Sequence, residues 1–205
     1  GGSGDGIGVA NGAATTDLDI TAVNVTGGNL GIVARNDGTG RTRIVATGRV
    51  SGGIVGITAS NGTSTTDLTV EAVDVTGGQR GIFAANFGTG TTRVTSTGTV
   101  ASTAAGGSGI LVANGANGSD VSVAVADITG WDGIIVQNFG TGATVVTSTG
   151  NIVGTDGNFG LFATNAASAT DLTVNVATVS HRRLQAIVVA NEGSGATRIT
   201  ATGNV

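Results

Sequence analysis

An asparagine recurs every 24–28 residues along this chain, and each copy ends the same short phrase. The phrase reads Gly-Ile-x-Val/Ala-x-Asn with small variations, and a repeat period of about 20–50 residues is typical of solenoids, in which each coil stacks on the one before it. The sequence therefore predicts eight stacked coils of about 25 residues. The recurring asparagines are Asn11, Asn36, Asn61, Asn86, Asn114, Asn138, Asn165 and Asn191.

The repeated phrase has the two-residue period of a β-strand. In the copy that ends at Asn86, Ile82 and Ala84 share one face with the asparagine, and Phe83 lies on the other face. The first position of the shared face is Ile or Leu in every copy, so we expect a buried column there. Its members are Ile7, Ile32, Ile57, Ile82, Ile110, Ile134, Leu161 and Ile187.

Two further strand-like segments follow in each coil. The first alternates between a TDLTV type and a TRVTSTG type, so the full repeat is about 50 residues, or two coils. The second carries an apolar residue at Val25, Val50, Val75, Val100, Ile128, Ile152, Val179 and Val205. Three short strands per coil, joined by turns rich in Gly, Asn and Asp, predict an all-β, right-handed parallel β-helix.

The whole chain, residues 1–205, reads as a single solenoid segment. Its coils are expected to start near residues 6, 31, 56, 81, 109, 133, 160 and 186. The segment opens in a glycine-rich turn at residues 1–4 and is expected to stop in the third strand of coil eight. Neither end shows a polar cap, so we expect uncapped ends that pair with a continuation of the chain or with like subunits.

The stacked asparagines are interpreted as a structural ladder. A turn asparagine tolerates left-handed backbone geometry and bonds local backbone, and a stacked amide can also donate to the next coil. A ligand-binding row of amides is the alternative. Four aspartates recur in every second coil, about 10 Å apart at the usual strand spacing, which favours turn acceptors over paired-carboxylate chemistry. They are Asp17, Asp67, Asp120 and Asp171.

The outward position between the buried residues is apolar in six of the eight coils. These residues form the predicted association stripe, Val33, Phe83, Leu111, Ile135, Phe162 and Val188. An exposed apolar column of this kind marks an interface in soluble proteins, and we expect lateral association or another segment to cover it. The alternative is that such residues simply suit a strand.

Other candidate sites are weaker. Thr-x-Thr pairs in even coils suggest an ice-binding array, but odd coils interrupt them; the pairs are Thr95/Thr97, Thr147/Thr149 and Thr200/Thr202. His181 lies in a basic turn and is interpreted as decoration of that turn. Trp131 offers a surface on which a sugar could stack. A single histidine provides no Ser-His-Asp set, so we expect no catalytic residues, no metal and no cofactor.

Composition excludes several partners. The net charge is −4, whereas nucleic-acid binding needs a basic stripe. The chain has no apolar run of membrane-spanning length, so no direct membrane insertion by this segment is expected. It also lacks cysteine, which excludes disulfides and cysteine metal sites.

The phrases DGI-x-V/A-x-N, N-x-GTG-x-T-x-V-x-x-TG-x-V and TDLTV-x-A resemble the passenger repeats of bacterial type V autotransporters. The resemblance implies a β-helical passenger at the cell surface or secreted, associated with the outer membrane and often adhesive. The signal sequence and barrel of that family are not in this sequence.

From these patterns we expect a non-catalytic structural or adhesive rod, a passenger-like segment of a larger protein. A host or cell-surface protein or a glycan is the expected partner besides like subunits. The alternatives are a carbohydrate-active β-helix enzyme or sugar-binding module, a self-assembling filament subunit and an ice-binding surface.

Overall fold

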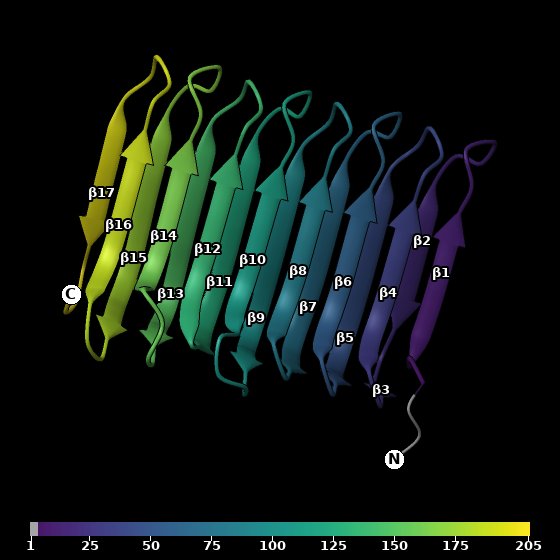
Figure 1. The fold of residues 1–205 in the computed structure, drawn as a ribbon, viewed down its shortest axis with the longest axis horizontal. Coiled ribbons are helices and arrows are strands. Elements are labelled where there is room, and N and C mark those ends of the chain that lie inside the picture. Colours follow the sequence, from purple (N-terminus) through teal and green to yellow (C-terminus); the bar gives the residue numbers. More distant parts are fainter. Residues whose placement is uncertain (1–3) are drawn as a thin grey trace.

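The protein is a β-solenoid of two parallel sheets packed face to face, as the computed structural model of residues 4–205 shows (Figure 1). Each coil contributes one strand to each sheet, except that the first coil gives two short strands to the second sheet. The first sheet contains β1 (Ile7–Asn11), β4 (Leu30–Asn36), β6 (Val55–Asn61), β8 (Arg80–Asn86), β10 (Ser108–Asn114), β12 (Asp132–Asn138), β14 (Phe159–Asn165) and β16 (Gln185–Asn191). These strands start within one residue of the predicted coil starts, and the parallel β-helix prediction is confirmed.

The second sheet holds the remaining strands. They are β2 (Leu18–Ala22), β3 (Val25–Gly27), β5 (Thr42–Gly52), β7 (Leu68–Gly77), β9 (Thr92–Ser102), β11 (Val121–Gly130), β13 (Thr144–Gly154), β15 (Leu172–His181) and β17 (Thr197–Ala201). All strand pairs in both sheets are parallel. At the usual strand spacing, eight coils make a rod about 40 Å long.

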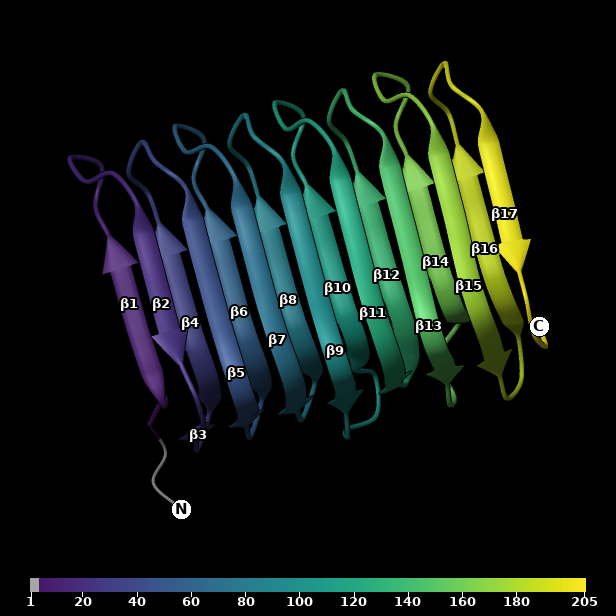
Figure 2. The same cartoon turned by 180° about the vertical axis from the view of Figure 1, so that it is seen from behind.

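The coil is right-handed. In Figure 1 the first sheet runs upward in front, the fainter second sheet runs downward behind, and the chain advances from right to left. Figure 2 shows the same path from behind. This hand is expected because a connection between parallel strands of one sheet is almost always right-handed.

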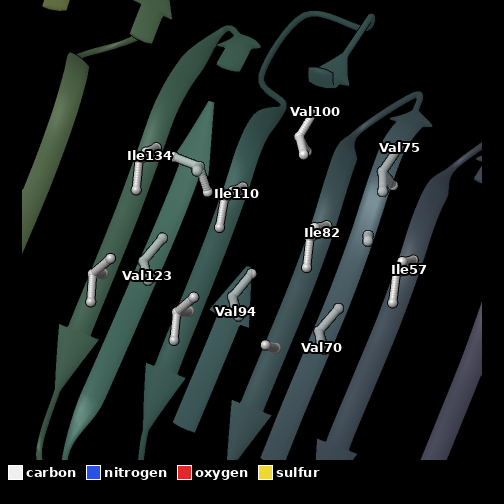
Figure 3. Close-up of a cluster of buried hydrophobic side chains, with 14 of the residues drawn as sticks. Ile57, Val70, Val75, Ile82, Val94, Val100, Ile110, Val123 and Ile134 are labelled. Carbon is white, nitrogen blue, oxygen red and sulfur yellow. The ribbon is translucent and has the colours of Figure 1, made fainter. Parts of the chain in front are cut away.

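The core lies between the two sheets and is continuous along the rod. Ile57, Ile82 and Ile110 from the first sheet have no solvent-exposed surface, and neither have Val70 and Val94 from the second (Figure 3). Each of these side chains stacks on its equivalents in the coils above and below, because the strands pair in register. The predicted isoleucine column is therefore the core of the first sheet, with half-buried members only in the two end coils.

The prediction of three separate strands per coil was wrong for most of the molecule. The second and third segments form one continuous strand, and only the first coil divides them, into β2 and β3. A register shift marks the junction, for example between Ala72 and Val75 where β7 pairs with β9. The boundary expected between the second and third strands is thus an irregularity inside one strand.

Turn length and strand length compensate each other within the 50-residue repeat. The even-coil strands β5, β9 and β13 have 11 residues, and the odd-coil strands β7, β11 and β15 have 10. The turn at residues 37–41 is correspondingly one residue shorter than the turn at residues 62–67. The extra residue in each even strand therefore leaves the stacking of the next coil unchanged.

The ends of the rod are more exposed than its middle. β1, β16 and β17 each pair with one neighbour only among residues 4–205. Val205 was predicted in a third strand of coil eight, but β17 ends at Ala201 and Val205 is exposed. Residues 1–3 of the predicted opening turn lie outside the described residues.

Candidate functional site: an apolar column on the outer face

The predicted association stripe forms a straight column on the outer face of the first sheet. Successive members pair in register across the strands, Phe83 with Leu111, Leu111 with Ile135, Ile135 with Phe162 and Phe162 with Val188. Val33 is separated from Phe83 by Thr58. We call these six apolar residues the outer apolar column, and all six side chains are half-buried.

The outer apolar column is packed by side chains on its own face. The guanidinium carbon of Arg80 lies 5.3 Å from the centre of the Phe83 ring, within cation–π range. The rings of Phe159 and Phe162 lie 4.8 Å apart, centre to centre, with a tilt of 31°. Phe159 therefore widens the apolar surface at Phe162, whereas Arg80 places a charged guanidinium against the ring of Phe83.

Charged groups on this face are already engaged. Arg35 pairs with Asp37 at 2.8 Å beside the turn. Asp132 accepts hydrogen bonds from the backbone N–H groups of Asn158 and Phe159 at 2.6 and 2.9 Å. The charged side chains of Arg35 and Asp132 are therefore bonded within the chain, and they stand at or beside strand ends rather than in the outer apolar column.

The outer face of the second sheet has a different character. Arg43 pairs with Glu71 at 3.0 Å, and Arg41 pairs with Asp19 at 3.1 Å. The Thr-x-Thr pairs also lie here, and their register partners break the array, because Thr95 is flanked by Glu71 and Ala124. The two sheets thus present one apolar and one charged, hydroxyl-bearing face.

The recurring asparagines lie inside the coil, at the end of each strand of the first sheet. In the even coils the side-chain oxygen accepts the N–H two residues later, as Asn86 does from Gly88 at 3.0 Å. The amide of Asn86 donates to the carbonyl of Thr66 in the preceding coil at 3.2 Å. The bond of Asn86 was predicted to run to the next coil, and it runs to the preceding one instead. The left-handed backbone that an asparagine tolerates is not used, because no residue other than glycine has a positive φ among residues 4–205.

The odd-coil asparagines bond differently. Asn61 donates to the carbonyls of Thr66 and Asp67 within its own coil. Asn114 donates to Ser119 and also to the side-chain oxygen of Asn138, at 3.0 Å in both cases. Burial leaves no surface for a ligand at the six inner asparagines, which are at most 1% exposed, so the amide row does not fit the alternative of a binding site.

The aspartates of the odd coils accept backbone hydrogen bonds from the following coil. Asp67 accepts from the N–H of Thr91 at 2.7 Å, and Asp120 accepts from that of Ala143 at 2.8 Å. Asp17 and Asp171 make the equivalent bonds to Arg41 and Ala196. These bonds agree with the interpretation of the four residues as turn acceptors.

His181 stabilises its own turn. Its Nδ1 accepts hydrogen bonds from the N–H groups of Arg183 and Leu184 at 3.1 and 2.7 Å. Trp131 is half-buried in the same row of turns, between β11 and β12, and its carbonyl accepts a hydrogen bond from the N–H of Gly157 at 2.8 Å. Within residues 4–205 no group of three His, Cys, Asp or Glu residues has a metal-binding arrangement. The same residues include no helix with the length and apolar character that crossing a membrane requires.

Sequence reasoning missed one feature, a pair of exposed aromatic rings on the turn edge. Phe87 and Phe139 follow the recurring asparagine in two successive even coils and are 50% and 48% exposed. The same turn position is Asp37 in the first repeat and Glu192 in the last. Comparing the four repeats at this position would have singled out the two rings.

Comparisons with protein-family models, with curated proteins and with solved structures found no match to this chain.

Proposed function

We propose that this chain is a non-catalytic structural or adhesive rod, a passenger-like segment of a larger protein that is secreted or held at the cell surface. The observation that carries the proposal is the outer apolar column, which runs in register through the coils on one face. A rod with one apolar face and one charged face is suited to holding a partner along its length.

Several features support this role over catalysis. The recurring aspartates and asparagines form hydrogen bonds with the backbone of the solenoid itself. The turns that depart from the repeat, at residues 103–107 and 155–158, are short. The proposed partners are a continuation of the chain, like subunits, or a protein or glycan on a cell surface.

The test is a binding assay with the rod displayed on beads, using bacterial and epithelial cells as targets. The variant replaces Phe83, Leu111 and Ile135 by threonine, which the chain itself carries at the equivalent Thr58. We expect the native rod to retain cells and the variant to retain at least tenfold fewer. Equal retention by both, or turnover of a polysaccharide by the purified chain, would contradict the proposal.

Phe87 and Phe139 favour a second candidate, a sugar-binding module. They occupy the same position in successive repeats, so they lie two coils apart, or about 10 Å at the usual strand spacing. Sugar rings stack on exposed aromatic faces, and a linear glycan along the turn edge would meet both rings. Gly115 lies between them in the intervening coil, and a Cβ there would come within 3.2 Å of the Phe87 ring.

This candidate is tested by affinity electrophoresis in gels that contain soluble β-linked glucans or xylans. Retardation of the native chain that is lost in the Phe87→Ala, Phe139→Ala double variant supports it. The control is Ile54→Ala, which removes an exposed apolar residue from the opposite turn edge. If the control loses as much retardation as the double variant, the rings are not the binding site.

A further inference from the structure

We infer that the outer face of the first sheet packs against the same face of a second copy of this chain, forming a side-by-side, two-fold dimer. The inference rests on the proposed structural role and gives it a specific partner.

The face has the area that a stable dimer requires. Eight strands at about 4.8 Å spacing, each up to seven residues long at about 3.3 Å per residue, cover roughly 40 by 20 Å. This is about 800 Å² per copy, which is the amount that one partner buries in a standard protein interface.

The chemistry of the face is that of an interface core. Phe83, Leu111, Ile135 and Phe162 stand on four successive strands and form its apolar centre. Small side chains lie beside them, such as Ala85 and Ala113, which pair with each other. At these two positions a second sheet can approach to the usual separation of about 10 Å; the long polar side chains in the same outward row are those of Arg35 and Gln137.

The shape of the sheet also suits a copy of itself. The strands of the first sheet lie almost parallel along the whole rod in both views (Figures 1 and 2). A strongly twisted face would contact its partner over a few coils only, whereas a flat one stays in contact along its length. In a two-fold interface both copies use the same surface patch, so the outer apolar column of one copy packs against the outer apolar column of the other.

The charge on the outer face of the second sheet makes the first sheet the more favourable face for dimerisation. On the second sheet the outward positions carry Arg43, Glu71 and Arg93. Burying these charges against a second copy would cost their hydration. The dimer is therefore expected to leave the second sheet in water and bury only the first.

The test is sedimentation velocity of the purified chain over a concentration series, with one outward arginine placed on each sheet. Leu111→Arg puts a charge at the centre of the apolar face. Val145→Arg puts the same side chain on the second sheet, in the register row that naturally holds Arg43, Arg93 and Arg198. Circular dichroism and thermal unfolding of both variants show that the solenoid is intact.

We expect the native chain and Val145→Arg to form dimers, and Leu111→Arg to weaken dimerisation by at least about 30-fold. Small-angle scattering should show that the dimer is thicker than the monomer but not longer than about 40 Å. A dimer about twice that length would mean end-to-end stacking and would overturn the inference.

Two other outcomes would also overturn it. Equal dimerisation of the two arginine variants would place the contact elsewhere. A native chain that stays monomeric at a concentration 100-fold higher than that used in the adhesion assay would mean that a different partner covers the face. The adhesion assay is read separately, so a rod that retains cells as a monomer keeps the proposed function while losing this inference.

Discussion

The hydroxyl of Thr92 donates a hydrogen bond of 2.9 Å to the side-chain oxygen of Asn114 in the next coil, and both residues are completely buried. Thr144 and Asn165 make the same bond at 2.6 Å one repeat later. One repeat earlier, Thr42 occupies the place of Thr92, but its hydroxyl has no hydrogen-bond partner in the described part of the chain. The repeats therefore contain both the bonded form of this pair and an unbonded one.

Replacing Thr92 by valine is expected to lower the free energy of unfolding by about 1–2 kcal/mol, because Asn114 keeps its place but loses a buried donor. Thr42→Val is the matched control, since it removes a buried hydroxyl that has no partner and should change the stability by less than about 0.5 kcal/mol. Urea denaturation of the two variants measures both values. Equal losses would show that Thr42 is hydrogen-bonded in solution, to the unpartnered oxygen of Asn61.

The irregular junction in each of the long even-coil strands β5, β9 and β13 depends on an acceptor from the preceding coil. The carboxylate of Asp74 accepts the N–H of Thr99 at 2.8 Å, and Asn24 accepts that of Arg49 in the same way at 2.9 Å. Asp74→Ala should therefore cost about 1 kcal/mol, whereas Asp74→Asn should be close to neutral because an amide oxygen already serves at Asn24. Thermal unfolding distinguishes the two, and a large loss in the asparagine variant would mean that the charge matters more than the hydrogen bond.

The solenoid, the coil boundaries and the buried columns could be predicted from the sequence because each is a periodic signal repeated eight times. An inward isoleucine such as Ile82 is fixed by the two-residue alternation around it. Its outward neighbour Phe83 follows from the same alternation. The straight stacking of the outer apolar column follows in turn, because coils of nearly equal length stay in register.

The details that could not be predicted are those that depend on irregular backbone. Gly98 follows a threonine and looks like the start of a turn, yet it lies inside the continuous strand β9 beside the Asp74 carboxylate. The coil to which Asn86 donates is set by the path of the turn that follows it, which the residue types alone do not fix.

The glycines of the even turns are expected to resist substitution because the turns of successive coils touch. A Cβ on Gly90 would lie 2.6 Å from the backbone nitrogen of Asp67 and would also meet the carboxylate of that residue. Gly90→Ala should therefore destabilise the protein by more than about 2 kcal/mol, as overpacking in a tight site does. Gly12→Ala is the control, since a Cβ there meets nothing within 4 Å, and its denaturation curve should match that of the native chain.

The cost of opening a cavity in the core should depend on the position of the coil in the rod. Ile82 is fully buried and stacks between Ile57 and Ile110, while Ile187 is half-buried and pairs with Leu161 on one side only. Because each coil contacts only its neighbours, we expect Ile82→Ala to cost about 4 kcal/mol and Ile187→Ala about 2 kcal/mol or less. Native-state hydrogen exchange provides the second reading. Ile187→Ala should speed exchange in β16 and β17 alone, whereas Ile82→Ala should speed it through the middle coils. Equal losses of unfolding free energy in the two variants, with identical exchange patterns, would contradict the stacked-coil account of stability.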